Sequence, residues 1–228
     1  MVEFSIVIPF FNEEPNVEGV LKEIIRLLAD HRIDYEIIAV NNGSTDGTGE
    51  IIETFSAAND RVKILSVPVN QGYGNGILEG LKKASGRHLG YSDGDGQNDG
   101  ESIVGCYKEL QISPELELAK GVPRKIEENF FRKFVSKVYN FLVSTLFGIE
   151  ATGINCKPKI FTRQLYEKLN PESKDWFIDA EIMIKCTRMN VRYVEYPIKV
   201  LQRKEGASHV SPKTIVEFLF NFLRYLFK

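Results

Sequence analysis

Cysteine is scarce in this 228-residue chain, and the three that occur, Cys106, Cys156 and Cys186, lie far apart. An odd number at this spacing fits neither a disulfide framework nor a zinc site. Long apolar runs are also missing, since none reaches the roughly 18 residues that a membrane-spanning helix needs. No charged-then-apolar leader precedes Phe4. We therefore expect a reducing, cytosolic location for a chain that does not span a membrane.

An excess of positive charge is absent as well. The chain has 29 Lys and Arg against 31 Asp and Glu, a net charge of -2, which argues against a general nucleic-acid binder. Internal repeats and low-complexity segments are not found. What is present is a 43% hydrophobic composition, enough for the sizeable core of one domain.

Short apolar runs alternate with segments of helical periodicity over the first half of the chain. Predicted strands cover 4–11, 35–40, 62–67, 88–93 and 116–121. Helices are predicted between them, the first capped by Asn12 and followed by acidic residues and Pro15. This alternation predicts βαβ units and an α/β fold with a mostly parallel sheet.

The second half is less regular. Helices are predicted at 130–147, 178–188 and 214–228, and strands at 159–162 and 192–200, the latter interrupted at Pro197. A polar, glycine-containing segment, 202–212, is expected to be mobile.

The most informative stretch is Asp93-Gly-Asp95-Gly-Gln97, at the end of a predicted strand. Open α/β sheets bind ligands at the carboxyl ends of their strands. Two carboxylates and an amide there suit Mg²⁺, which is usually held by one or two carboxylates together with substrate phosphates. The simpler alternative is an Asp- and Gly-rich turn without a ligand.

Gly72-x-Gly74-x-Gly76 invites comparison with a dinucleotide fingerprint, but it follows the third strand rather than the first. We therefore reject that interpretation. Close approach of the backbone to a bound nucleotide and a plain helix-entry turn both remain open.

Four motifs in order carry a family resemblance. They are Val7-Ile-Pro9-Phe-Phe11-Asn12-Glu13-Glu14, Val40-Asn-Asn-Gly-Ser44-Thr-Asp46-Gly47, Asn70-Gln-Gly72-Tyr-Gly74 and Asp93-Gly-Asp95-Gly-Gln97. Together they resemble glycosyltransferase family 2, in particular its polyprenyl-phosphate sugar transferases. The resemblance implies a single-domain GT-A fold, with a nucleotide-binding half at 1–121, an acceptor half at 122–210 and an amphipathic C-terminal helix at 211–228.

The same resemblance implies roles for individual residues. The nucleotide would be bound by Pro9, Phe11, Glu13, Asn41, Asn42, Gly72, Asp93 and Gly94. Mg²⁺ or Mn²⁺ would be bound by Asp93, Asp95 and Gln97, with Asp95 counted as catalytic through the metal. Asn41-Asn42 stands where the family usually has two aspartates, so the base preference cannot be inferred from it.

Contacts to phosphate or acceptor are implied for Arg124, Arg132, Lys159, Arg203, Ser208 and His209. Arg124, Lys125, Arg132 and Lys133 form a basic cluster that suits phosphate, with a solvated helix face as the alternative. His209 replaces the lysine that ends the late Arg-x-x-Gly-x-Ser element in similar sequences, so a fixed charge is not assured there.

Asp179 and Glu181 are candidate catalytic bases, the alternative being a solvated pair on a helix surface. An acceptor that is already a phosphate needs no strong base. The wide apolar faces of the helices at 130–147 and 214–228 call for cover by the sheet, by a second subunit or by a membrane interface.

We therefore predict a metal-dependent inverting glycosyltransferase that moves a sugar from a nucleotide-diphosphate-sugar to polyprenyl phosphate. It would make peripheral contact with the inner face of the membrane, with a homo-oligomer possible and no nucleic acid bound. The alternatives are a glycan or polypeptide hydroxyl acceptor, or a catalytically silent nucleotide-binding protein.

Overall fold

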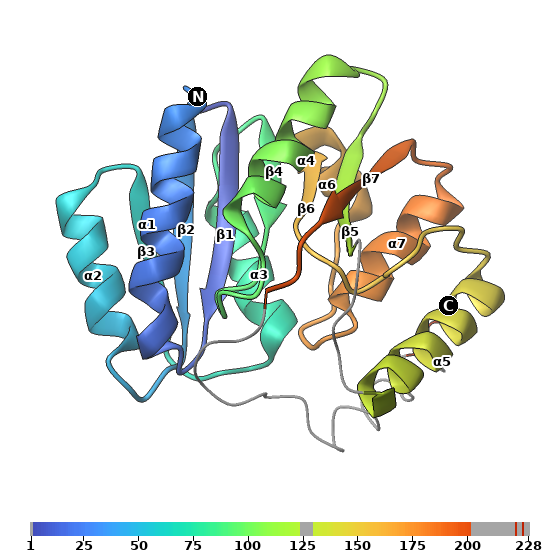
Figure 1. The fold of residues 1–228 in the computed structure, drawn as a ribbon, viewed down its shortest axis with the longest axis horizontal. Helices are drawn as coiled ribbons and strands as arrows, with labels where there is room; N and C mark the ends of the chain where they lie inside the picture. The colour runs from blue at the N-terminus through green and yellow to red at the C-terminus, as the bar shows by residue number, and fades with distance from the viewer. Residues whose placement is uncertain (1, 124–129, 202–221, 223–224, 226–228) are drawn as a thin grey trace.

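The computed structural model describes residues 2–123, 130–201, 222 and 225, with the side chains of 130–138 excepted. Across these residues the strands form one seven-stranded sheet in the order β3-β2-β1-β4-β6-β5-β7 (Figure 1). The strands are β1 (Phe4–Phe10), β2 (Tyr35–Asn42), β3 (Val62–Val67), β4 (His88–Tyr91), β5 (Leu118–Pro123), β6 (Lys159–Thr162) and β7 (Tyr193–Ile198). The helices are α1 (Glu14–Asp30), α2 (Thr48–Ala58), α3 (Tyr73–Lys83), α4 (Gly100–Ile112), α5 (Phe130–Phe147), α6 (Arg163–Leu169) and α7 (Ile178–Arg188).

The sheet is mostly parallel, as the sequence predicts. β1 pairs in parallel with both β2 and β4, β2 with β3, and β5 with β7. β6 is the exception, because it runs antiparallel to both β4 and β5. The carboxyl ends of β1, β2, β3 and β4 therefore lie at one edge of the sheet.

Two apolar cores cover the two faces of the sheet. Alternate residues of β1 divide between them: Val7 faces the core shared with α3, α6 and α7, whereas Ile6 and Ile8 face the core shared with α1, α2 and α4. Side chains of successive strand residues point to opposite faces, so a continuously apolar strand such as β1 supplies both. The result is a three-layer α/β/α arrangement (Figure 1).

Three local predictions need correction. Asn12 does not cap α1; Glu13 precedes the helix, and Asn12 adopts a φ of 52° and accepts a hydrogen bond from the Thr45 backbone instead. Pro197 does not interrupt the last strand, because β7 pairs only with β5 among the described strands, so Pro197 lies on the sheet's edge, where proline is tolerated. The helix α6 is absent from the prediction, since it spans only 7 residues.

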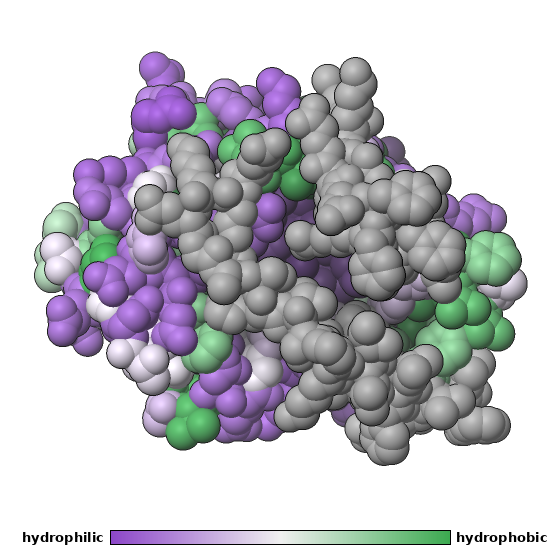
Figure 2. All heavy atoms as spheres, turned by 60° about the horizontal axis from the view of Figure 1, so that its bottom comes forward, coloured by the Kyte–Doolittle hydropathy of each residue, from purple (hydrophilic) through white to green (hydrophobic). Residues whose placement is uncertain are grey.

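The helix α5 leaves apolar side chains uncovered. Val143 is buried, but Phe141, Leu142 and Leu146 are 68%, 43% and 47% exposed. Figure 2 shows hydrophobic surface at its right edge, on the side where Figure 1 places α5. No helix among the described residues is both long and apolar enough to span a bilayer.

Glu36 is a buried carboxylate that links three strands and one turn. It accepts hydrogen bonds from Ser5 Oγ and the Ser85 backbone N–H, each at 2.6 Å, and it pairs with Lys63. Burial by itself would raise the pKa of Glu36, but the Lys63 ammonium and the serine donors outweigh it and lower the pKa from 4.5 to about 2.

We expect Glu36→Gln to lower the free energy of unfolding at pH 7 by about 2 kcal/mol. Because the pKa is lower in the folded state, Glu36 stabilises the fold above pH 4.5, and this contribution is lost as the pH falls toward 2. Urea unfolding at pH 7 and pH 3 should show the variant's deficit shrinking at pH 3. Glu79→Gln, which removes an exposed i,i+3 pair with Lys82, is the control and should cost under about 0.5 kcal/mol. An equal deficit at both pH values would contradict this account.

Candidate active site at the carboxyl edge of the sheet

Predicted site residues from three strands meet at the carboxyl edge. In the register of β1 and β2, Pro9 is opposite Val40, and Val40 directly precedes the Asn41-Asn42 pair. Gly94 follows β4, and a Cβ placed on it would lie 2.5 Å from the Phe10 ring and 2.8 Å from the Pro9 carbonyl oxygen. Only glycine therefore lets the turn after β4 lie against the end of β1.

The turns after β1 and β2 are joined by hydrogen bonds. The Glu13 backbone N–H donates to Thr48 Oγ1 at 2.9 Å, and Glu14 Oε2 accepts from the Gly47 N–H at 2.8 Å. Glu13 is buried, and its carboxylate accepts a bond from Asn16 Nδ2 at 2.6 Å. Phe11 directly follows β1 in the same turn. The predicted nucleoside pocket thus coincides with a braced pair of loops.

Asn41 and Asn42 differ in what they bind. Asn41 Oδ1 accepts from the Ser44 N–H at 3.0 Å, which closes the turn. Asn42 Nδ2 donates to the Gly72 carbonyl at 3.1 Å, and its buried Oδ1 has no hydrogen-bond partner among the described residues. Buried polar atoms are nearly always satisfied, so this acceptor is suited to a donor from a ligand.

The glycine-rich turn lies against the chain itself. Gly72 has a φ of 119°, and a Cβ on it or on Gly74 would lie 2.3 Å from the carbonyl oxygens of Lys174 and Ser173, respectively. The Asn75 N–H also donates to the Lys174 carbonyl at 2.8 Å. The close approach to the segment at Ser173 and Lys174 is by itself a sufficient reason for glycine at both positions. A nucleotide contact for Gly72 stays a prediction.

The turn after β4 carries the predicted metal ligands. Asp95 Oδ1 accepts a hydrogen bond from the Gln97 backbone N–H at 3.0 Å. The side-chain nitrogen of Gln97, Nε2, donates to the Leu201 carbonyl at 3.4 Å, and the side-chain oxygen takes no part in this bond to Leu201. In the described part of the chain, no three His, Cys, Asp or Glu side chains converge on one point. Two carboxylates and an amide fit a Mg²⁺ or Mn²⁺ ion whose other ligands are phosphate and water.

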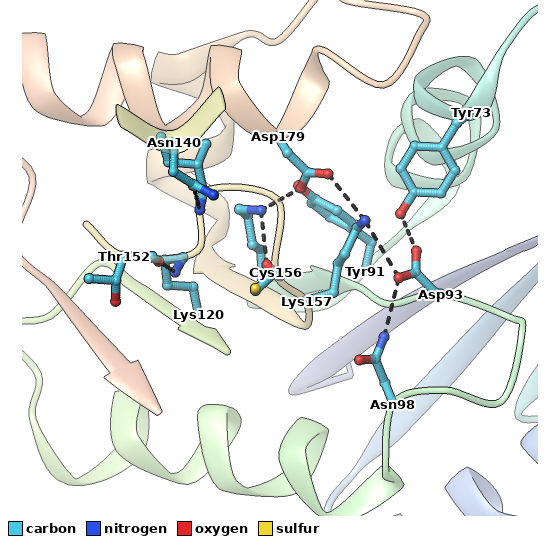
Figure 3. Close-up of polar contacts among 12 residues, drawn as sticks. Tyr73, Tyr91, Asp93, Asn98, Lys120, Asn140, Thr152, Cys156, Lys157 and Asp179 are labelled. Atoms are coloured by element: carbon cyan, nitrogen blue, oxygen red, sulfur yellow. Dashed lines mark hydrogen bonds and ion pairs between the residues drawn. The ribbon is translucent and has the colours of Figure 1, made fainter. Parts of the chain in front are cut away.

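Asp93 is engaged by three donors of the chain (Figure 3). Its Oδ1 accepts from the Tyr73 hydroxyl at 2.5 Å, and its Oδ2 accepts from Asn98 Nδ2 at 3.3 Å. The Lys157 ammonium lies 3.5 Å from the same Oδ2. The carboxylate is therefore fixed in place by residues of α3, of the turn after β4 and of the segment before β6.

Asp179 is the centre of a buried ion cluster beside Asp93. Its Oδ1 accepts from the Tyr91 hydroxyl at 2.8 Å and pairs with Lys159, while its Oδ2 lies 3.3 Å from the Lys157 Nζ. Burial by itself would raise the pKa of Asp179, but the two ammonium groups and the hydroxyl outweigh it and lower the pKa. Asp179 is thus held as an ionised carboxylate.

The predicted alternative of a solvated pair on a helix surface is wrong, because Asp179 and Glu181 are both fully buried. Glu181 accepts backbone N–H bonds from Glu172 and Ser173 and pairs with Lys185 at 2.7 Å, so it anchors the loop before α7. A base role for either acid stays a prediction.

Lys159 is also fully buried. Besides Asp179, its ammonium contacts the Cys156 carbonyl at 3.0 Å, and burial lowers the pKa of Lys159 to about 8 against the opposing effect of Asp179. These contacts make it a counter-ion within the fold, and its predicted phosphate contact stays a prediction.

Four residues near the site were not predicted to act there: Tyr73, Asn98, Lys157 and Trp176. Tyr73 and Trp176 stack with ring centroids 4.2 Å apart and planes 8° from parallel. Asn98 directly follows the predicted ligand Gln97, and Lys157 lies two residues before Lys159, which is the one signal that could have identified them. No local pattern pairs Tyr73 with Trp176.

Several residues predicted to contact phosphate lie outside the described part of the chain. Arg124, Lys125, Arg203, Ser208 and His209 lie outside the described residues, as does the predicted helix at 214–228 apart from Phe222 and Tyr225. Arg132 and Lys133 belong to α5, but their side chains are outside the described part.

The family model described as Glycosyl transferase family 2 matches residues 5–169, which include the carboxyl ends of β1, β2, β3 and β4. The chain belongs to this family. The family resemblance drawn from the four motifs is thereby confirmed.

Relatives of this family member include transferases whose names contain dolichyl phosphate or undecaprenyl phosphate. It is 28% identical to a dolichyl-phosphate beta-glucosyltransferase (ALG5A) of Trichomonas vaginalis over 87% of this chain and 65% of that one. It is 25% identical to an undecaprenyl-phosphate 4-deoxy-4-formamido-L-arabinose transferase of Pseudomonas fluorescens over 96% and 63%. It is 26% identical to the glycosyltransferase AglD of Haloferax volcanii over 86% of this chain and 33% of that one. The chain spans between one third and two thirds of the length of these relatives.

Solved structures of this fold confirm the predicted GT-A architecture. Glucosyl-3-phosphoglycerate synthase of Mycobacterium tuberculosis, in complex with Mn²⁺, UDP-glucose and phosphoglyceric acid, superposes with a TM-score of 0.78 at 20% identity, covering 99% of this chain and 80% of that one. The same enzyme with Mg²⁺ and UDP gives 0.72 at 20% identity, covering 90% and 73%. At this identity the likeness establishes the fold.

Proposed function

We propose that this family 2 chain transfers a sugar, with inversion, from a nucleoside-diphosphate sugar to polyprenyl phosphate. The observation that carries the proposal is the Asp93-Gly94-Asp95 turn, which packs against the carboxyl end of β1. The other neighbour of β1 in the sheet is β2, which ends in Asn41-Asn42. This is the edge at which open α/β sheets bind their ligands.

Asp95, Asp93 and Gln97 are the residues that would hold a divalent cation. When bound, Mg²⁺ or Mn²⁺ neutralises the charge that develops on the departing diphosphate. The braced loops after β1 and β2 would hold the nucleoside, with Asn42 Oδ1 available to a ligand donor. Complexes of the structural neighbour with Mn²⁺ or Mg²⁺ and UDP support this arrangement.

The acids near the site favour a phosphate acceptor over a hydroxyl acceptor. A hydroxyl needs a general base whose pKa lies near the working pH. The pKa values of Asp179 and Glu181 are lowered in spite of their burial, Asp179 by two ammonium groups and Glu181 by Lys185 and the loop before α7. Both are therefore weak bases, whereas a phosphate acceptor is already ionised and can attack directly once positioned.

A lipid-linked acceptor also fits the exposed apolar residues of α5. Phe141, Leu142 and Leu146 would contact a membrane interface, where the chain of a polyprenyl phosphate resides. The names of the Trichomonas and Pseudomonas relatives support the same acceptor class.

A panel of nucleoside diphosphates, each with and without Mn²⁺, tests the donor site by thermal unfolding. A ligand at 100 times its Kd stabilises the folded state by about 2.7 kcal/mol, which is about 5–10 °C for a chain of this size. We expect one base to give this shift, and only with Mn²⁺. Absence of a shift with every nucleotide and metal combination would contradict the proposal.

Product analysis tests the acceptor. We expect a lipid-linked sugar when polyprenyl phosphate and the matching nucleoside-diphosphate sugar are supplied. Transfer to a glycan or polypeptide hydroxyl, with no lipid product, would replace the proposed acceptor and leave the donor chemistry standing. Nucleotide binding without any transfer would favour the silent protein.

A further inference from the structure

Lys157 places a buried positive charge between two carboxylates. Its side chain is 8% exposed, and its Nζ lies 3.5 Å from Asp93 Oδ2 and 3.3 Å from Asp179 Oδ2. Figure 3 shows the ammonium between the two acids, one from the turn after β4 and the other from α7. Removing a charge from water is costly, so its two anionic partners are what keep it there.

Aromatic rings fix the same ammonium from another side. Its Nζ lies 4.9 Å from the centre of the Tyr73 ring and 5.7 Å from that of Trp176. Cations are attracted to ring faces at such distances. Because Tyr73 also donates its hydroxyl to Asp93, the rings, the ammonium and the carboxylate form one connected unit.

The two neighbouring buried lysines do not share this position. Lys159 is bound by the other oxygen of Asp179 and by the Cys156 carbonyl. Lys120 donates to the Thr152 carbonyl at 2.6 Å and lies 3.3 Å from Glu195. Among the lysines that the structure describes, Lys157 alone forms an ion pair with Asp93.

We propose that Lys157 is a positioning residue that acts as the resting counter-cation of Asp93, so that the divalent cation and the diphosphate bind as a coupled pair. The inference rests on the proposed donor site. A carboxylate has about four lone-pair sites, and Tyr73, Asn98 and Lys157 engage three of those of Asp93. A metal ion that arrives alone competes with the ammonium and is repelled by it. A diphosphate offers the ammonium a new anionic partner and so removes this obstacle.

Mn²⁺ binding to the full chain, counted by electron paramagnetic resonance, tests the coupling with inorganic pyrophosphate as the second ligand. Lys157→Met should bind Mn²⁺ alone roughly tenfold more tightly, because one positive charge near the ion is gone. The factor by which pyrophosphate raises Mn²⁺ affinity should fall by a similar amount. Lys157→Arg, which keeps the charge, should remain close to the wild type in both measurements.

Trp176 supplies a second readout, since it is the single tryptophan of the chain and stacks on Tyr73. Mg²⁺ with pyrophosphate should change its fluorescence in the wild type, and Mg²⁺ alone should change it less. The matched control is Lys82→Met at the far end of α3, which also loses one positive charge but from an exposed pair with Glu79. We expect it to bind Mn²⁺ like the wild type.

The outcomes separate this inference from the proposed function. The role of Lys157 alone would be overturned if Asp95→Asn removes Mn²⁺ binding while Lys157→Met leaves it unchanged or weakens it. If Lys157→Met does not fold, the wild-type protein still tests the coupling. Mn²⁺ and pyrophosphate that bind to it independently of each other would overturn the proposal. Absence of Mn²⁺ binding to the wild type in both conditions would overturn the inference and the donor site together.

Discussion

Asp95→Asn is expected to abolish sugar transfer, lowering kcat at least about a thousandfold while the fold persists. The substitution exchanges a charged metal ligand for a neutral amide, and the metal supplies several kcal/mol of charge stabilisation to the leaving diphosphate. A loss of about 4 kcal/mol in the transition state corresponds to a thousandfold in rate. Transfer of labelled sugar to polyprenyl phosphate measures the effect.

Asp99→Asn is the matched control for this prediction. Asp99 lies in the same turn, but it caps α4 by accepting the Ser102 N–H at 3.1 Å. Asparagine is an equally good capping residue, so transfer and stability should both stay close to the wild type. Unchanged turnover in Asp95→Asn would refute the metal assignment, and a loss in both variants would point to disruption of the turn.

Asp179→Asn is expected to destabilise the protein by about 3–5 kcal/mol, a larger effect than that expected for Glu36→Gln. Removing one partner of a buried ion cluster leaves uncompensated charge behind. Here two ammonium groups, on Lys157 and Lys159, would lose their shared anion, and the neutral amide would replace it only as a dipole. Urea unfolding at pH 7 measures the change.

Asp30→Asn provides the comparison for an ion pair in water. Asp30 pairs with Arg26 at 3.1 Å, and the side chains of Asp30 and Arg26 are 60% and 62% exposed, respectively. Exposed pairs contribute little, so its cost should be under about 0.5 kcal/mol. A cost below 1 kcal/mol for Asp179→Asn as well would show that the cluster is not a net support of the fold.

The sequence predicts the carboxyl edge of the sheet because the signals for it are local. β1, β2 and β3 are short, apolar and β-branched, and each is followed by turn residues, so their order and direction follow from periodicity and chain connectivity. Asp93 and Asp95 come directly after β4, and their position at the edge needs no knowledge of distant residues.

The ion cluster beneath that edge could not be predicted in the same way. Asp179 reads as an exposed helix acid unless the sequence also shows that Lys157, Lys159 and Tyr91 surround it. These partners come from β4, from β6 and from the segment before it. Only the antiparallel insertion of β6 beside β4 brings them together. Burial of a charge is decided by such long-range contacts, and helical periodicity does not report them.

The most direct test of the central claim is a crystal structure with Mn²⁺ and the nucleoside diphosphate selected by the thermal panel. We expect an anomalous peak for manganese within direct coordination distance of Asp95, together with the diphosphate at the carboxyl edge of β1 and β4. A diphosphate bound elsewhere, or manganese with no contact to Asp93 or Asp95, would contradict the claim.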